Sequence, residues 1–530
     1  MFSAEAADAN PMNSQAQDSL LAAMLEPEFY PKPPAEVTHK ETHISHLFFA
    51  GELVYKVKKP VRYSFLDYST LEKRRYFLQE ELRLNRRLAP SVYIGVLPIT
   101  FDDLGWRLGG WAEPAEYTLV MRRLPEKRML PFLLETGQVT PAMMRELAEF
   151  VFEFHDTADR VTAIEPERYP GIVETQWREN LADLAAYIDQ LIDAESFRAV
   201  EKFGADFIEQ HAELLQRRAA EGWIRDVHGD LHTEHICFAP EGIQIFDCIE
   251  FKPLFRRCDL AAEIAFLAMD VEVRGGGGLV APFLTRYAEL LDDGELMQLL
   301  PFWKCQRALV RGKVYALRGP DGFAIAVKYL RYATRMSWAP LQPFVVMICG
   351  LTGSGKSTLA RQLSERTGAA VINSDAVRKA IAGQSGRQFA AYGEGIYSAT
   401  MTEKTYKKMA RTAEQLIAEG KGAILDASFT RRAQREKFVR LADKHKIPLL
   451  LIHCSASEPT TQERLAQRQA QGLDVSDGRW EVYLEQKKAC EPLDEIPLAA
   501  RLQLNTEAAL DQLTSDSEKF LRRRLICQPR

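Results

Sequence analysis

The sequence predicts two kinds of architecture in one chain: an α+β N-terminal part and a C-terminal α/β part whose parallel β-sheet is sandwiched by helices. Three observations favour this. Residues 46–125 are rich in strand patterns around one long helical segment, and residues 140–335 are mainly helical. After residue 343, the strand-like segments AAVINSD, AILDASF and PLLLIHC alternate with helices, as in a parallel sheet covered on both faces.

The predicted boundaries follow from these changes in pattern. Residues 1–40 are polar and are expected to form a flexible arm with at most one short helix. Residues 41–340 are expected to form the first folded domain, and residues 341–530 the second. A chain of 530 residues is too long for one ordinary core.

Composition excludes several classes of protein. The net charge of −5 does not indicate a general binder of nucleic acids or membrane surfaces. The eight cysteines include no C-x-x-C pair, so neither a disulfide framework nor a structural zinc site is indicated. The N-terminus lacks the features of a signal peptide, and no apolar run is long enough to span a membrane. We therefore expect a cytoplasmic protein.

In the first domain, HLFFAGELVYKVKKPV predicts two strands around the Ala50–Glu52 turn, the second with alternating apolar residues. Thr70–Leu88 predicts a long charged helix, and VYIGVLPITF and YTLVMRRL predict two further strands. The helical segments after residue 140 are interrupted by the loop-like run WIRDVHGDLHTEHICF and by GIQIFDCIEF, which predicts a short strand pair.

The chemically dense stretch of this domain runs from His228 to Asp247. Asp230 lies on a tight loop and Asp247 follows a strand, an arrangement that suits phosphoryl transfer: one carboxylate orients the acceptor hydroxyl and the other holds a metal ion. Upstream, Lys56 on a strand and Glu81 on the long helix are placed to form an ion pair that steadies the phosphates of a nucleotide.

HGDLHTEH followed by Asp247 resembles the signature of the aminoglycoside phosphotransferase-like family, which has the bilobal protein-kinase-like fold, over residues 40–330. The resemblance implies that Asp230 is the catalytic base, that Asp247 is a metal ligand, and that Lys56 and Glu81 are the paired residues, with Glu80 as the alternative to Glu81. It also implies that Met121 and Arg122 line the adenine.

One position departs from that family, because His235 stands where it has a metal-binding Asn. A neutral imidazole suits Mn²⁺ or Zn²⁺ better than Mg²⁺, so this domain has either an altered second metal site or weak or no activity. Other interpretations remain: a zinc cluster of His228, His232 and His235, a purely structural loop, or a solvated strand end carrying Lys56.

The second domain opens with a phosphate-binding loop. The apolar run Phe344–Cys349 predicts a buried strand, and a helix follows the loop. Its glycines let successive N–H groups point at phosphate oxygens, Lys356 reaches the β- and γ-phosphates, and the Ser357 hydroxyl binds Mg²⁺. The predicted ATP-binding residues are Gly350, Leu351, Thr352, Gly353, Ser354, Gly355, Lys356, Ser357 and Thr358.

Two further segments carry candidate residues for catalysis. A strand is expected to end in Asp375, which would orient the acceptor hydroxyl, and Arg378 one helical turn later would bind the substrate. The alternative is that Asp375 only caps the next helix. Asp426, at the end of another predicted strand, is a candidate Mg²⁺ ligand of Walker-B type.

Arg464 and Arg468 lie four residues apart on one predicted helical face, like a lid that closes over the triphosphate and neutralises charge. The segment 474–477 would be its return, and the alternative is a pair of ordinary solvated arginines. With the phosphate loop, these segments resemble the small P-loop kinases, which include polynucleotide 5′-kinases, gluconate-type kinases and zeta-toxin-like kinases, over residues 343–525.

Together the two resemblances imply an ATP- and Mg²⁺-dependent kinase, with Mn²⁺ as an alternative ion, that transfers the γ-phosphate to a hydroxyl acceptor. The sequence shows no basic track for a nucleic-acid strand, so a small-molecule acceptor is favoured over a nucleic acid. The alternative hypothesis is a nucleotide sensor, in which the N-terminal domain binds ATP without turnover and gates the second domain or a partner.

Overall fold

The computed structural model describes residues 14–63, 66–383, 397–471 and 479–526. The chain divides into two compact units, Met1–Ala333 and Thr334–Arg530. The division falls within one helix, α12 (Pro320–Met336). Each unit has hydrophobic core clusters of its own, and in the described part of the chain no helix is long and apolar enough to cross a membrane.

The first lobe of the N-terminal unit is built on a six-stranded sheet in the order β1-β2-β3-β8-β6-β7. All neighbouring strands are antiparallel. A two-residue turn at Gly51–Glu52 joins β2 to β3 as the sequence predicts, and Gly51 has a φ of +62°, which glycine adopts without strain. The strands are β1 (Val37–Glu41), β2 (Ser45–Ala50), β3 (Leu53–Lys58), β6 (Tyr93–Asp102), β7 (Gly105–Leu108) and β8 (Pro114–Arg122).

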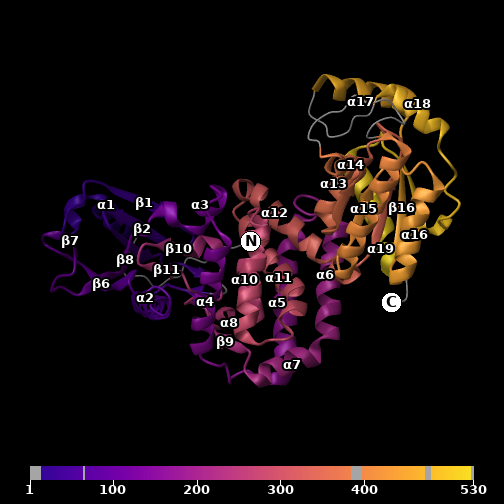
Figure 1. Ribbon diagram of the computed structural model, residues 1–530. Helices are drawn as coiled ribbons and strands as arrows, with labels where there is room; N and C mark the ends of the chain where they lie inside the picture. The colour runs from indigo at the N-terminus through magenta and orange to yellow at the C-terminus, as the bar shows by residue number, and fades with distance from the viewer. Residues whose placement is uncertain (1–13, 64–65, 384–396, 472–478, 527–530) are drawn as a thin grey trace. The chain divides into compact units, whose positions relative to one another are not determined.

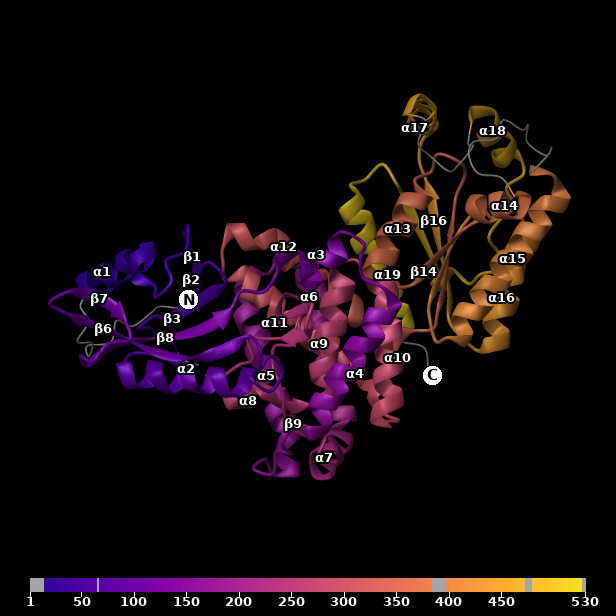
Figure 2. The same ribbon diagram turned by 60° about the vertical axis from the view of Figure 1, so that its left-hand side comes forward.

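A helix covers each face of this sheet (Figure 2). Because side chains alternate along β3, Tyr55 and Val57 pack toward α1 (Ser14–Leu25), whereas Val54 packs toward α2 (Leu71–Asn85). Helix α2 begins after Thr70, whose hydroxyl accepts a hydrogen bond from the N–H of Lys73. The lysines of β3 therefore face α2.

From residue 14, where the described part of the expected arm begins, the chain is folded against the sheet. It therefore differs from the flexible arm expected for residues 1–40. Leu20 and Met24 of α1 and Tyr30 are buried in the core above the sheet, and the Tyr30 hydroxyl donates to the Met24 carbonyl at 2.6 Å. The strand β1 then joins the sheet edge. The burial of three apolar side chains outweighs the polar composition from which an arm was predicted.

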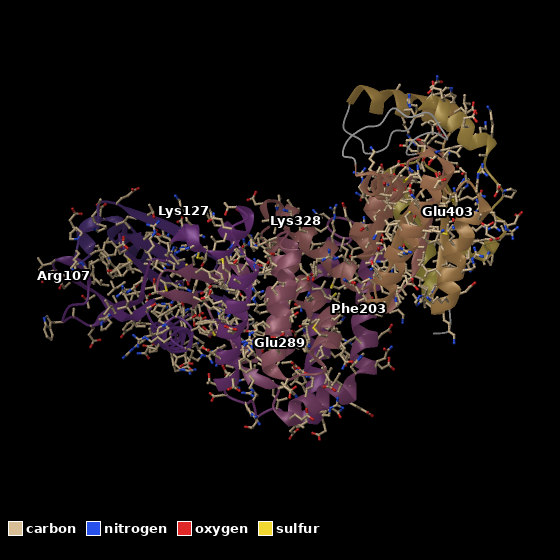
Figure 3. The ribbon with its side chains drawn as sticks, in the orientation of Figure 1. Arg107, Lys127, Phe203, Glu289, Lys328 and Glu403 are labelled. Atoms are coloured by element: carbon tan, nitrogen blue, oxygen red, sulfur yellow. The ribbon has the colours of Figure 1, made fainter. Side chains whose placement is uncertain are left out.

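The second lobe of this unit is helical and carries the loops of the candidate site. Two short antiparallel strand pairs lie within it, β9 with β12 and β10 with β11. Figure 3 marks the first lobe by Arg107 on β7 and the second by Glu289 on α10. The helices are α3 (Leu130–Glu135), α4 (Pro141–Thr157), α5 (Tyr169–Leu184), α6 (Ala194–Gln210), α7 (Ala212–Glu221), α8 (Pro253–Arg256), α9 (Leu260–Val273), α10 (Gly277–Leu291), α11 (Leu296–Ala316) and α12. The short strands are β9 (Ile224–Asp226), β10 (Ile236–Ala239), β11 (Gly242–Ile245) and β12 (Arg257–Asp259), with β4 (Arg62–Tyr63) and β5 (Leu66–Asp67) in the first lobe.

The C-terminal unit has a five-stranded sheet in the order β14-β15-β13-β16-β17, with every pair parallel. This confirms the predicted α/β fold and places the strand of the phosphate loop at the centre. The strands are β13 (Val345–Cys349), β14 (Ala370–Asn373), β15 (Ala423–Asp426), β16 (Leu449–Ser455) and β17 (Arg501–Asn505). The helices are α13 (Lys356–Thr367), α14 (Ser374–Ala382), α15 (Ala399–Ala418), α16 (Arg432–His445), α17 (Glu458–Gln471), α18 (Trp480–Lys488) and α19 (Leu510–Ile526).

Helices cover both faces of this sheet (Figure 1). Leu359 and Leu363 of α13 and Leu521 of α19 pack against one face, where Val346 and Ile348 of β13 point. Tyr406 and Met409 of α15 and Phe438 of α16 pack against the other face, where Val345 and Met347 point. Burial on both faces explains why β13 reads as a continuous apolar run. The loops that form the site follow the carboxyl ends of the strands.

Candidate active sites

Lys56 connects three elements of the N-terminal unit. Its Nζ donates to Oε1 of Glu81 at 2.7 Å and to Oδ1 of Asp247 at 3.0 Å. Burial alone would lower the pKa of Lys56, but the carboxylates of Asp247 and Glu81 raise it well above its ordinary value. Lys56 is therefore positively charged at neutral pH. Glu80, the alternative partner, instead pairs with Arg83 on the surface.

Asp247 lies two residues beyond the end of β11, in a left-handed backbone conformation with a φ of +65°. Its N–H donates to the Tyr93 hydroxyl at 3.1 Å. The carboxylate is about half exposed, at 47%. Burial favours the neutral acid, but Lys56 and His235 hold the pKa of Asp247 below its usual range. An ionised carboxylate with one oxygen beside a cation and the other accessible is suited to bind a metal ion.

The loop that carries Asp230 is shaped by backbone contacts of its neighbours. His228 is fully buried; its Nε2 donates to the Phe246 carbonyl at 2.9 Å, and its Nδ1 accepts from the N–H of Asp230 at 3.3 Å. Burial lowers the pKa of His228 to about 3, so the ring is neutral. Gly229 has a φ of +83°, and a Cβ there would lie 2.7 Å from the Arg256 Cα. Only glycine fits that position.

Two buried acidic side chains of α9 accept hydrogen bonds from the backbone of the same loop. Glu263 accepts hydrogen bonds from the N–H groups of His228, at 2.9 Å, and of Gly229, at 3.1 Å. Burial raises the pKa of Glu263 to about 7. Asp270 accepts from the N–H of Thr233 at 3.0 Å. These bonds fix the loop at both of its ends.

Asp230 lies on this loop with a side chain about 30% exposed. Burial favours its neutral form, but His232, then His235 and Arg311, hold the pKa of Asp230 below its usual range. Arg311 is itself buried and donates to Glu234 at 2.9 Å. Asp230 is thus an ionised acceptor at neutral pH, as needed to orient a hydroxyl group.

His235 lies between the two aspartates. Its Nδ1 is 3.0 Å from the carbonyl oxygen of Asp230, which can only accept, so Nδ1 carries a proton. Its Nε2 is 3.5 Å from Oδ2 of Asp247. Two ligands of one metal ion lie about 3 Å apart, so His235 and Asp247 are placed to share one.

The alternative zinc cluster of three histidines does not form in the described residues, because the backbone occupies both ring nitrogens of His228. Asp230, His232 and His235 form a group whose possible ligand atoms lie within 4.8 Å of one another. However, an Nη of the Arg311 guanidinium is 3.2 Å from Nε2 of His232. That cation opposes a metal ion at His232, so His235 is the better ligand.

Met121 and Arg122, expected to line the adenine, lie at the end of β8. Met121 is buried with Val54 and Phe246 packed in the same apolar cluster, while Arg122 is exposed. The N–H of Arg122 donates to the Val92 carbonyl at 2.8 Å.

In the C-terminal unit, residues 350–355 form a glycine-rich loop between β13 and α13, as predicted. Gly353 and Gly355 have φ values of +79° and +80°. A Cβ on Gly350 would lie 2.4 Å from the Cys454 carbonyl oxygen, so the loop can follow this path only with glycine there. Lys356 is the first residue of α13, and within the described part of the chain its side chain makes one long hydrogen bond, 3.4 Å, to the Leu351 carbonyl. The helix N-terminus and this cation favour an anion.

Asp426 ends β15 beside β13, in register with Ile348. Its Oδ2 accepts from Nδ2 of Asn373 at 2.6 Å, whereas its buried Oδ1 has no hydrogen-bond partner among the described residues. A buried carboxylate oxygen without a donor is costly unless a ligand completes it. Asp426 therefore fits the metal-ligand role predicted for it, directly or through water.

One detail of the prediction is wrong: β14 ends at Asn373 and not at Asp375. Asn373 is the cap of α14, because its Oδ1 accepts from the N–H groups of Asp375 and Ala376 at 3.0 and 2.9 Å. Asp375 lies in the first turn of α14 and pairs with Arg378. The capping alternative for Asp375 is also wrong, since Asn373 performs that task.

Arg464 and Arg468 both belong to α17. Arg464 does not project as a free lid residue, because its guanidinium donates to the Thr506 hydroxyl at 3.0 Å and carbonyl at 2.7 Å. Thr506 in turn donates to the Ser354 carbonyl of the phosphate loop at 2.9 Å. Arg464 is thus fixed beside the loop. The side chain of Arg468 and the segment 474–477 lie outside the described residues.

Comparisons with known proteins agree with this two-part organisation. The model of the phosphotransferase enzyme family matches residues 52–300, and the model described as an AAA domain matches residues 345–493. Uncharacterized proteins of Mycobacterium tuberculosis (strain ATCC 25618 / H37Rv) and Mycobacterium bovis are 32% identical over 448 residues, which cover 82% of this chain and 87% of theirs. This chain belongs to their family.

This chain thus joins an aminoglycoside phosphotransferase-like domain to a P-loop kinase-like domain. Among solved structures, a gluconokinase from Sinorhizobium meliloti is 17% identical, covering 34% of this chain and 94% of its own, with a TM-score of 0.25. An APS kinase from Mycobacterium tuberculosis is also 17% identical, covering 34% of this chain and 98% of its own, with a TM-score of 0.26.

Several residues of the sites were not found from the sequence. Lys58 lies two residues after Lys56 and hence on the same face of β3, which is a signal that could have identified it. Glu250, Glu263 and Arg311 reach the site from segments far apart in the chain. The hydrogen bond from the Thr352 N–H to Gln486 of α18, at 2.8 Å, spans 134 residues and leaves no local pattern.

Proposed function

We propose that this chain is an ATP-dependent phosphotransferase with a nucleotide site in each unit, and that each γ-phosphate passes to a hydroxyl acceptor. The observation that carries the proposal is the convergence at Lys56, which bridges Glu81 and Asp247, with His235 between Asp247 and Asp230. A cation for phosphates, a metal ligand and an accessible base thus come together from separate segments, which phosphoryl transfer requires.

In the N-terminal site, Lys56 would bind nucleotide phosphates while Glu81 holds it in place. Asp230 would accept a hydrogen bond from the acceptor hydroxyl and take its proton as the new P–O bond forms. Asp247 and His235 would hold the divalent ion, which supplies charge neutralisation at the phosphates when bound. The intact ion pair of Lys56 with Glu81 and the partly exposed carboxylate of Asp230 favour a site that transfers phosphate. They are less expected of the alternative, a nucleotide sensor without turnover.

In the C-terminal site, the N–H groups of residues 350–358 and Lys356 would bind the β- and γ-phosphates. Ser357 and Asp426 would hold Mg²⁺, and Asp375 would orient the acceptor hydroxyl, with Arg378 on the substrate side. Arg464 is already fixed at the loop through Thr506, so we propose that it stabilises charge there without a large movement.

A small molecule is the proposed acceptor in both sites. The net charge of −5 supports it over a nucleic acid, since strand binding relies on positively charged surfaces.

Nucleotide binding tests the two-site proposal directly. Titration calorimetry with a non-hydrolysable ATP analogue and Mn²⁺ should give two sites per chain. Lys356→Ala should reduce the stoichiometry to one, because the phosphate loop loses the lysine proposed to contact the β- and γ-phosphates. A single site in the unmodified protein would refute the two-site proposal.

The metal preference of the N-terminal site provides a second test. In a Lys356→Ala background, transfer should be faster with Mn²⁺ than with Mg²⁺, because Nε2 of His235 faces Asp247 and imidazole is a better ligand for Mn²⁺. His235→Asn should shift the ratio of kcat/KM for the two ions toward Mg²⁺ by about tenfold or more.

The control for this experiment is His445→Asn, on the exposed side of α16, where the ring contacts Glu414. That variant should keep the ion preference of the unmodified site. An Mg²⁺ preference that is the same before and after His235→Asn would show that His235 is not a ligand.

A further inference from the structure

A second buried lysine lies beside Lys56. Lys58 is fully buried, and its Nζ donates to Oε2 of Glu81 at 2.8 Å and to Oε1 of Glu250 at 2.5 Å. The Tyr68 hydroxyl donates to the same oxygen of Glu250 at 2.6 Å. A buried charge is costly unless it is paired and hydrogen-bonded, and here each charged group of the cluster has such partners.

The two oxygens of Glu81 have separate tasks. Oε1 accepts from Lys56 and Oε2 accepts from Lys58. While Lys58 holds Oε2, the carboxylate cannot rotate away from Lys56 without breaking a buried ion pair. The Lys58 contact therefore orients the carboxylate of Glu81 toward Lys56, the residue that would bind phosphate.

The same cluster reaches the segment that follows Asp247. Glu250 lies three residues after Asp247 and is tied through Lys58 to Glu81 on α2. A second hydrogen bond links the same two segments: the N–H of Cys248 donates to Oδ1 of Asn85, also on α2, at 2.8 Å. Helix α2 and the segment 247–250 are consequently held in one arrangement.

We propose that Lys58 and Glu250 are positioning residues of the N-terminal phosphotransferase, which orient Glu81 for Lys56 and fix the metal-binding Asp247 relative to both. This proposal rests on the proposed function of that site. Lys56 divides its hydrogen bonds between Glu81 and Asp247. When Asp247 turns to a metal ion, Lys56 depends on Glu81 alone, and Glu81 depends on Lys58.

The test uses the paired substitution Lys58→Met/Glu250→Met in full-length protein with Lys356→Ala. Replacing both partners of a buried ion pair by apolar residues of similar size can preserve stability. The paired substitution releases Oε2 of Glu81, which is the effect under test, whereas Lys58→Met alone would in addition leave the buried carboxylate of Glu250 without its cation. Nucleotide affinity, kcat and KM for ATP, and the thermal midpoint are measured together.

The matched control is Arg74→Met/Glu116→Met. This pair is equally buried in the same lobe, with Arg74 Nε 2.8 Å from Glu116. Arg74 also donates to the backbone carbonyl of Tyr68 at 3.1 Å, but no hydrogen bond or ion pair between described residues joins the pair directly to Lys56, Glu81 or Asp247. Any general effect of losing a buried ion pair in this lobe should appear equally in the control.

We expect the Lys58/Glu250 variant to lose about 10- to 100-fold in kcat/KM for ATP, as small displacements of positioned groups do, while the control loses little. Glu250→Gln, which keeps an oxygen for Lys58 and Tyr68, should recover part of that loss. Equal losses in the variant and control at similar thermal midpoints would overturn the positioning role.

The nucleotide titration keeps the proposal testable if no acceptor is phosphorylated. Binding of the Mn²⁺-analogue complex should weaken in the Lys58/Glu250 variant and not in the control, even without turnover. Unchanged affinity would overturn the positioning proposal. Absence of transfer in the parent Lys356→Ala protein would count instead against the proposed N-terminal activity.

Discussion

Asp230→Asn is expected to lower phosphate transfer by the N-terminal unit about 10²- to 10⁴-fold, the usual contribution of a positioned acid or base. The amide keeps the size of the side chain but cannot accept the proton of the acceptor hydroxyl. The loop should keep its shape, because His228, Gly229 and Thr233 are held by backbone contacts and by acids on α9. Initial rates in a Lys356→Ala background measure the effect.

Asp206→Asn is the matched control, since Asp206 on α6 pairs with Lys202 on the surface. It should leave the rate unchanged. Nucleotide affinity should be retained in both variants, because Asp230 contacts the acceptor in this account and not the phosphates. Full transfer activity in Asp230→Asn would remove Asp230 from the catalytic role.

Lys356→Ala is expected to reduce transfer by the C-terminal unit about 10²- to 10³-fold, as the loss of one strong electrostatic contact at an active site does. Lys356 lies at the N-terminus of α13, and the side-chain hydrogen bond that it makes to a described residue is the long one to Leu351, so its removal breaks little of the fold. The thermal midpoint should therefore change little while the rate falls.

The comparison variant is Lys421→Ala, which removes an exposed lysine of the same unit that pairs with Glu419. Both rates are measured in an Asp230→Asn background, so that only the C-terminal site is active. Equal activity in Lys356→Ala and Lys421→Ala would show that the phosphate loop does not support catalysis.

The phosphate loop could be predicted from the sequence because its chemistry is local. Strand, glycine turn, lysine and helix follow one another within 15 residues, and each is needed for the next. The burial of β13 and the helices on both faces also followed from short apolar runs that alternate with helical segments. The end of β14 was misplaced because Asn373 caps a helix that starts before Asp375, and strand ends are poorly marked by apolar patterns.

The N-terminal site could be predicted only in part. Asp230, Asp247, Lys56 and Glu81 were found through a family signature, and the structure brings these four residues together through the ion pairs of Lys56 and the contacts of His235. The residues that hold them could not be found in the same way. Glu250 meets Lys58 across 192 positions, and no local pattern encodes such a contact.

Arg464 shows the same limitation in the second unit. A pair of arginines four residues apart suggested a lid, but the guanidinium of Arg464 is held by Thr506, 42 residues later in the chain. The N-terminal arm differs for a related reason: Leu20 and Met24 pack against strands that come later in the sequence. In both places the tertiary contact decides the structure.

We propose that two separate sites in this chain transfer phosphate from ATP. The most direct test measures transfer of labelled γ-phosphate to a panel of nucleosides, sugars, aminoglycosides and 5′-hydroxyl oligonucleotides by the unmodified protein, Asp230→Asn and Lys356→Ala. The account predicts phosphorylated products that divide into two groups, one lost with each variant. Tight ATP binding without transfer to any acceptor, or products insensitive to both substitutions, would contradict it.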